Sequence, residues 1–306
     1  MFGAIRSRLA RLSAPIAAPP EPPASPFPVP VPGPLAADAV LQARSAAFGA
    51  ACRSHVAAFD QALAGLVAAG SLRPDQQDYA RDHRLRFAEA LYAIETLLAP
   101  EPGWPRCQVL EIGSSITPML FHAAFPELRL TAACLFRHKQ LDGIVERAVQ
   151  MDLEKLDLRS ATALPLPDPP LRDLDMVMLC EVLEHLLVNP ANLFRALAGT
   201  LRPGGLLYVT TPNFLRQGCR GLILAGRNPQ PLFRPEFRPE DRFHHHVREY
   251  TMAELLEAMQ AAGLVLELAQ YSACWDSAEA AATLPADALR NLVVVGRKPR
   301  DPAAGA

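Results

Sequence analysis

The sequence predicts an α/β protein built on a doubly wound, mostly parallel β-sheet. Val109 to Ile112, Met176 to Cys180 and Leu206 to Thr210 are short apolar runs, as expected for strands buried on both faces. Leucines recur every fourth residue within Leu186 to Leu201, which indicates a helix, and Arg202-Pro203-Gly204-Gly205 ends it. Strands that alternate with helices imply right-handed crossovers and a ligand site at the carboxyl ends of the strands.

Residues 1–34 are a basic tail followed by a proline-rich linker. Residues 1–13 place apolar side chains and three arginines on a short helix without any acid, so contact with a membrane surface and a frayed tail both fit this segment. Pro15 to Pro34 is too rich in proline to build a core, and we expect it to be disordered or extended.

Residues 35–100 are predicted to form a helical extension. An apolar stripe runs along Ala39 to Ala69 and is broken by Gly70 and Pro74, and a second helix is expected from Pro74 to Leu98. These helices are expected either to cap the ligand cleft or to pack against the edge of the sheet, and a purely packing role fits their stripes equally well. Residues 101–299 then form the main domain.

Composition narrows the class of protein. A chain of 306 residues holds one α/β domain with an appendage, and its net charge of −2 argues against a protein that depends on a basic surface to bind nucleic acid. The six cysteines form no CxxC pair, which predicts reduced thiols and a cytoplasmic protein. No apolar run approaches the roughly 20 residues that span a bilayer.

The first candidate site is the segment VLEIGSSITP, Val109 to Pro118. Gly113 lets the backbone approach a ligand, because glycine lacks a Cβ and tolerates positive φ. Ser114 and Ser115 leave room and offer hydroxyls, while the helix that begins near Thr117 presents main-chain N–H groups. Glu111 is an acid at the end of an apolar strand and needs a partner, which a bound amino group would supply.

A second constellation follows the strand that ends at Cys180. Glu181, Glu184 and His185 are spaced as on one face of a helical turn, and His246 precedes a helix expected over Thr251 to Ala262. Two carboxylates and one or two imidazoles can hold a divalent metal. Alternatively, Glu184 and His185 only brace a loop, and His246 acts as a general base toward an acceptor hydroxyl.

Four segments together resemble the class I S-adenosylmethionine-dependent methyltransferases. They are VLEIGSS, LPLPDPPLRDLDMVMLCEVLEHL, LRPGGLLYVTTPN and HHHVREYTMAELLEAMQAAGLVLE. The closest likeness is to bacterial methyltransferase-domain proteins with EVLEH and HxREYT blocks, and it covers Cys107 to Lys298. The resemblance implies a Rossmann-like sheet of seven strands in the order 3-2-1-4-5-7-6, with Asn291 to Arg297 as an antiparallel last strand.

The resemblance also assigns roles to residues. S-adenosyl-L-methionine is the expected cofactor, with Glu111, Ile112 and Gly113 at its methionine portion and Cys180 and Glu181 beside its sulfonium. Thr210 to Asn213 are expected to bound the acceptor pocket. The family commonly has an acid at the end of the second strand to hold the ribose, but Leu128 to Lys139 contains none.

Asp152 and Glu154, with Leu153 between them, are therefore expected near the adenine or ribose, although solvated charges on a loop fit the segment MDLEKLD equally well. The set Glu181, Glu184, His185 and His246 is similar to the metal sites of small-RNA 2′-O-methyltransferases and of some ubiquinone-pathway O-methyltransferases. There the metal holds the acceptor hydroxyls and lowers their pKa.

The insertion 214–243 contains several arginines and aromatic residues, as expected of a substrate-shaping lid that attracts phosphate or carboxylate. Three functions remain open at this point. The first is O-methylation of a small polar molecule or saccharide. The second is a non-catalytic cofactor-binding or scaffold domain, and the third is metal-dependent RNA 2′-O-methylation, against which the acidic pI counts. The oligomeric state is not predicted.

Overall fold

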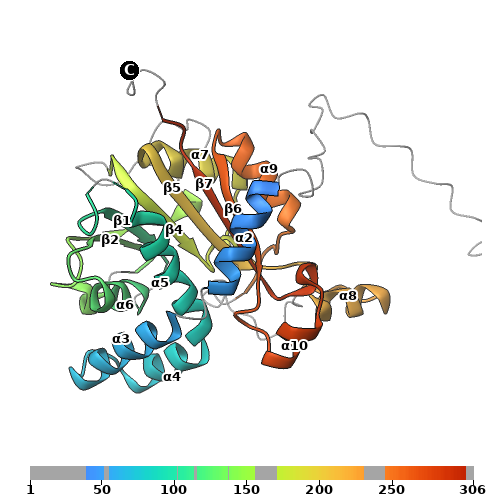
Figure 1. Cartoon of the computed structure of the whole chain (residues 1–306), viewed down its shortest axis with the longest axis horizontal. Helices are drawn as coiled ribbons and strands as arrows, with labels where there is room; N and C mark the ends of the chain where they lie inside the picture. The colour runs from blue at the N-terminus through green and yellow to red at the C-terminus, as the bar shows by residue number, and fades with distance from the viewer. Residues whose placement is uncertain are drawn as a thin grey trace, which may run out of the picture. The chain divides into compact units, whose positions relative to one another are not determined.

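The computed structural model describes residues 39–51, 55–101, 103–113, 116–136, 138–155, 171–230 and 245–300. One seven-stranded sheet has the order β3-β2-β1-β4-β5-β7-β6, which confirms the predicted order (Figure 1). The strands are β1 Gln108–Ile112, β2 Arg129–Cys134, β3 Arg147–Gln150, β4 Leu174–Cys180, β5 Leu201–Pro212, β6 Val265–Ser272 and β7 Asn291–Arg297. The first five pair in parallel, and β7 is antiparallel to β5 and β6, as expected.

Helices cover both faces of the sheet (Figure 1). They are α2 Ala39–Ala51, α3 Val56–Ala68, α4 Pro74–Asp82, α5 Arg84–Leu98, α6 Ile116–Ala124, α7 Pro190–Thr200, α8 Gln217–Leu224, α9 Met252–Ala261 and α10 Ala278–Thr283. Short 3₁₀ turns are η3 Lys139–Leu141, η4 Leu153–Lys155, η5 Leu183–His185 and η7 Ala286–Ala288. The core on one face joins α3, α5 and α6 to the sheet, and the core on the other joins α7 and α9.

The central strands are buried on both faces because they are apolar at every position. In β4, Met176 and Met178 belong to the core beneath α5 and α6, while Val177 and Leu179 belong to the core beneath α7 and α9. All four are fully buried. Continuous burial along a strand is what a parallel sheet with helices on both faces requires.

The N-terminal extension has four helices where the apolar stripes predicted two. The predicted helix over Ala39 to Ala69 is α2 and α3, and the second is broken at His83 into α4 and α5. No proline or glycine marks the second break in the sequence. Instead, the His83 ring packs edge-on against Trp275 with ring centroids 4.4 Å apart, so a tertiary contact accompanies the bend.

The N-terminal extension packs against the edge of the sheet and also covers the carboxyl ends of its strands. Helix α2 lies across β6, the edge strand, and crosses in front of it in Figure 1. Two contacts join the two elements: Arg44 pairs with Glu267 at 2.7 Å, and the Ser45 hydroxyl accepts a hydrogen bond from the Ala269 N–H. Helices α4 and α5 instead reach the carboxyl ends of the strands and line the cavity described below.

The helix expected over Leu186 to Leu201 is shorter, because α7 begins at Pro190 with an Asn189 cap and ends at Thr200. The segment Arg202-Pro203-Gly204-Gly205 ends the helix as predicted but belongs to β5. Its main chain exchanges hydrogen bonds with Lys298 beyond β7, which extends the sheet through this turn. The side chain of Arg202 pairs with Asp175 at 2.6 Å and Glu101 at 2.9 Å.

Several sequence predictions fall outside the described residues. These are the basic tail and linker of residues 1–34, Ser114, Ser115 and the part of the insertion from 231 to 243. In the described part of the chain, five cysteines are free thiols, and none of the helices has both the length and the apolar character that a bilayer crossing requires.

Candidate active site

A cavity of about 640 Å³ opens at the carboxyl ends of β1, β2 and β4. The ends of the paired strands β1 and β4 both line it, β1 through Ile112 and Gly113 and β4 through Cys180 and the following Glu181. The two corners that the sequence singled out therefore frame one hollow. Asp152 and Leu153, predicted near the ribose or adenine, also line it.

The backbone conformation at position 113 requires glycine. Gly113 has φ of +122°, and a Cβ at this position would collide with Cγ2 of Val182. Glu111 is fully buried two residues earlier but is not among the described residues that line the cavity. Its neighbours include Cys134 and Cys180, where burial first and the Glu111 charge second raise the pKa of both thiols. The contacts that we expect of Glu111 and Gly113 with the methionine portion of the cofactor stay predictions.

Glu181 turns the chain away from β4 with a φ of +55°, a strained conformation for a residue other than glycine. Its main-chain N–H donates to the Thr210 carbonyl at 3.0 Å. Its Oε1 accepts hydrogen bonds from Thr210 Oγ1 at 2.7 Å and Asn291 Nδ2 at 2.9 Å. The carboxylate is thus fixed by two neighbouring strands at the junction between this cavity and a second one.

The second cavity has a volume of about 330 Å³ and adjoins the first. Four residues line both: Tyr79, Arg86, Glu181 and His185. The remaining residues that line the second cavity are mostly charged or imidazole side chains, together with one proline and one tryptophan: Glu184, Pro212, Arg216, His246, Glu249, Trp275 and Arg290. Pro212 belongs to the segment Thr210 to Asn213 that was expected to bound the acceptor pocket.

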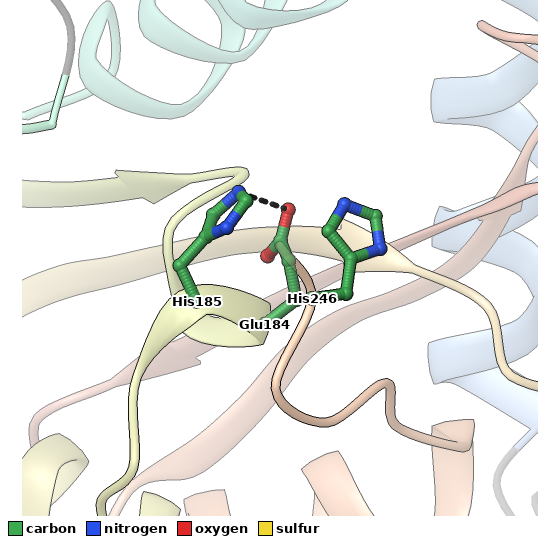
Figure 2. Close-up of side chains that lie close together, drawn as sticks. All are labelled: Glu184, His185 and His246. Atoms are coloured by element: carbon green, nitrogen blue, oxygen red, sulfur yellow. Dashed lines mark ion pairs between the residues drawn. The ribbon is translucent and has the colours of Figure 1, made fainter. Parts of the chain in front are cut away.

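Glu184, His185 and His246 converge at the wall of the second cavity. Figure 2 shows the Glu184 carboxylate between the two imidazole rings. One potential ligand atom from each residue lies within 4.8 Å of the other two, and His185 Nε2 is 3.7 Å from Glu184 Oε1. Such a set has the donor types and the spacing to hold a divalent cation.

Glu181 does not share a helical turn with this set, contrary to the sequence prediction. The turn η5 spans Leu183–His185, and the positive φ of Glu181 places it outside that turn. Glu184 is 1% exposed and accepts a hydrogen bond from Thr211 Oγ1 at 2.9 Å. Burial, with a smaller effect of the Glu181 charge, raises the pKa of Glu184 well above its ordinary value.

Both imidazoles are oriented through Nδ1. His185 Nδ1 donates to the main-chain carbonyl of His245 at 2.9 Å, and His246 Nδ1 lies 2.7 Å from Glu249 Oε1. Burial alone would raise the pKa of Glu249, but hydrogen bonds from His246 and Arg216 outweigh it and lower the pKa. Glu249 is therefore an anionic acceptor, and Nδ1 of His246 is the ring nitrogen that donates to it.

A capping role of the N-terminal extension was expected from the sequence, but the residues that it places at the cavity were not. Arg73, Gln76 and Tyr79 of the α4 region and Arg86 of α5 line the first cavity. The available signal was Arg86, a charged residue set among apolar ones in LRFAEALYAI, which a purely packing helix would not bury.

Residues 109–269 match the model of a family described as a methyltransferase domain. The chain belongs to this family. It is a class I S-adenosylmethionine-dependent methyltransferase, and S-adenosyl-L-methionine is its cofactor. The match covers β1 through most of β6 but not the N-terminal extension or β7.

Several solved structures are similar to this methyltransferase at low sequence identity. A Burkholderia thailandensis 1,6-didemethyltoxoflavin-N1-methyltransferase is 19% identical with a TM-score of 0.45, covering 76% of this chain and 89% of that one. A Mesorhizobium loti S-adenosylmethionine-dependent methyltransferase is 20% identical with a TM-score of 0.41, covering 67% and 98%. Such distant structures give no information on the acceptor. A search of curated protein sequences finds no match.

Proposed function

We propose that this methyltransferase methylates an oxygen of a small polar molecule or saccharide bound in the second cavity. The observation that carries the proposal is the arrangement of two adjoining cavities around Glu181, the second of which presents His246. S-adenosyl-L-methionine supplies an electrophilic methyl group when bound in the first cavity. Alignment of the acceptor oxygen with that group, and exclusion of water, supply much of the catalysis.

His246 is the proposed proton acceptor. Its Nδ1–H is held by Glu249, so the Nε2 lone pair can take the proton from an acceptor hydroxyl as the oxygen attacks. Glu181 is proposed to hold the acceptor side of the junction, because Thr210 and Asn291 fix its carboxylate. This division of roles needs no metal.

A divalent metal held by Glu184, His185 and His246 is the alternative within the same function. Their donor set fits, because a carboxylate oxygen and two imidazole nitrogens lie within 4.8 Å of one another. A metal at this position would lower the pKa of an acceptor hydroxyl and would displace the proton that burial favours on Glu184.

The test is incorporation of label from methyl-labelled cofactor into polar metabolite and saccharide extracts, with and without a chelator. His246→Gln is expected to lower the rate by about 10²–10⁴ under either reading. His185→Gln separates them: it abolishes activity if a metal is required and leaves most of it if His246 is a base.

Other outcomes count against the proposal. A product methylated on nitrogen, seen by mass spectrometry and NMR, would exclude oxygen as the acceptor atom. Label that enters the RNA fraction would instead support RNA 2′-O-methylation. Tight cofactor binding with no transfer to any fraction would support a non-catalytic domain.

A further inference from the structure

Arg86 is a buried cation on the wall shared by the two cavities. It is 6% exposed, and it comes from the N-terminal extension rather than from the family-matched segment. Its Nη2 donates to Tyr79 Oη at 2.9 Å, while its Nε is buried and has no hydrogen-bond partner among the described residues. A buried N–H on a charged group without an acceptor is costly, so an acceptor that arrives with a ligand is expected here.

Trp275 provides a second donor beside it. The Arg86 guanidinium carbon lies 5.6 Å from the centroid of the Trp275 ring and 4.5 Å from that of Phe87. Trp275 lines the second cavity, and its indole Nε1 is likewise buried without a hydrogen-bond partner in the described part of the chain. Two neighbouring residues that line the same cavity, one of them cationic, therefore each have an unsatisfied N–H group.

The other arginines of this cavity are already engaged. Arg216 pairs with Glu249, and Arg290 Nη1 donates to the Trp275 carbonyl at 2.9 Å. Burial would lower the pKa of Arg86, but the neighbouring Tyr79 and Glu181 outweigh it and raise the pKa, so Arg86 carries its charge. Arg86 therefore provides this wall with a positive charge and with one N–H donor, on Nε, that no described residue accepts.

We propose that Arg86 and Trp275 bind an anionic oxygen, from a carboxylate or a phosphate, on the acceptor. This inference rests on the proposed function and narrows it to acceptors that carry an anionic group near the methylated atom. A neutral oxygen would satisfy the indole N–H but would leave the buried guanidinium without a counter-charge from the ligand. The aromatic surroundings confine the anion and strengthen its pairing by excluding water.

The experiment measures anion binding by calorimetry on the full chain saturated with S-adenosylhomocysteine. Inorganic phosphate and acetate are the probes, which separate the two anion classes, and acetamide is the neutral control. The unmodified protein is expected to bind at least one anion and to bind acetamide weakly. Arg86→Gln is expected to lower the affinity for the anion at least about tenfold. Arg84→Gln on the same helix, where the side chain is exposed and pairs with Asp60, is expected to leave it unchanged.

Trp275→Phe keeps the ring and removes only the N–H. This variant is expected to lower the affinity for the anion several-fold. It still tests the proposal if Arg86→Gln lowers the melting temperature too far for that variant to be studied. Equal anion binding in the unmodified protein and both variants would overturn the proposal, as would no anion binding at all.

A different role for Arg86 would also be visible. If Arg86→Gln weakens S-adenosylhomocysteine but not methylthioadenosine, which lacks the carboxylate, then Arg86 holds the cofactor carboxylate and the inference is wrong. Failure of the proposed function looks different, because it appears as absent methyl transfer to an acceptor oxygen while anion binding still depends on Arg86.

Discussion

Replacing Glu89 with Gln should change how the stability of this methyltransferase depends on pH. Glu89 lies in α5, is 3% exposed and accepts a hydrogen bond from Ser272 Oγ at 2.9 Å. Burial raises its pKa from 4.5 to about 7; the Ser272 hydrogen bond opposes this rise, and the Glu181 charge adds a smaller increase. The protonated form is thus the one that the fold accommodates.

The direction of the pH effect follows from proton binding. Between its pKa in the unfolded chain and its higher pKa in the folded chain, Glu89 binds more protons when folded. The stability that this provides is fully present below the unfolded pKa and is lost as the pH rises through the folded one. With a folded pKa of about 7 and an unfolded one of 4.5, the loss between about pH 5 and about pH 8 is roughly 2.5 kcal/mol.

Glu89→Gln removes the titration but keeps the shape and an oxygen for the Ser272 hydroxyl. Urea unfolding of both proteins at the two pH values should show the variant gaining about 2.5 kcal/mol relative to the parent at the higher pH. Glu127→Gln is the matched control, because its side chain is 59% exposed. A stability difference between Glu89→Gln and the parent that is the same at both pH values would refute the reasoning.

Three further changes test other parts of the structure. Gly113→Ala should weaken S-adenosylhomocysteine binding at least tenfold in calorimetry, because φ is positive and the added Cβ collides with Val182; unchanged affinity would contradict the assigned close approach. Thr251→Ala removes the cap that accepts from the Glu254 N–H and should cost about 1 kcal/mol in urea unfolding, with Ser as the control that restores it. Glu101→Gln leaves two arginines without their shared carboxylate and should cost about 3 kcal/mol near pH 7. Since these contacts lower the pKa of Glu101, the cost should shrink as the pH falls below 4.5, and a pH-independent loss would argue against the ion pairs.

The central strands could be predicted from local patterns in the sequence, whereas the strand order followed from the resemblance to the class I methyltransferases. Apolar runs with burial on both faces identify central strands, and a glycine directly after the first strand marks where the backbone meets a ligand. The break between α4 and α5 was not accessible, although the one at Gly70 and Pro74 was. The bend at His83 has no local breaker and accompanies a ring contact with Trp275, which lies far away in the chain.

The acceptor side was only partly predictable, for a related physical reason. Glu184, His185 and His246 could be grouped because similar blocks place them together, but the left-handed backbone of Glu181 removes it from their turn. A spacing rule assumes regular helix geometry, and the chain departs from it directly after β4. Arg86 was missed because its helix was judged by the apolar residues on it rather than by the one cation among them.

The division of the site between two parts of the chain bears on how acceptors are recognised. The family-matched segment 109–269 contains Gly113, Glu181 and the two imidazoles, which we propose serve cofactor binding and methyl transfer. Arg86 and Trp275 lie outside that segment and supply the unsatisfied donors. Because a cavity discriminates acceptors by the polar groups that a wrong acceptor leaves unpaired, specificity should follow these two residues rather than the shared ones. Methyltransferases with the same central segment but a different N-terminal extension should then differ in acceptor while keeping the same cofactor.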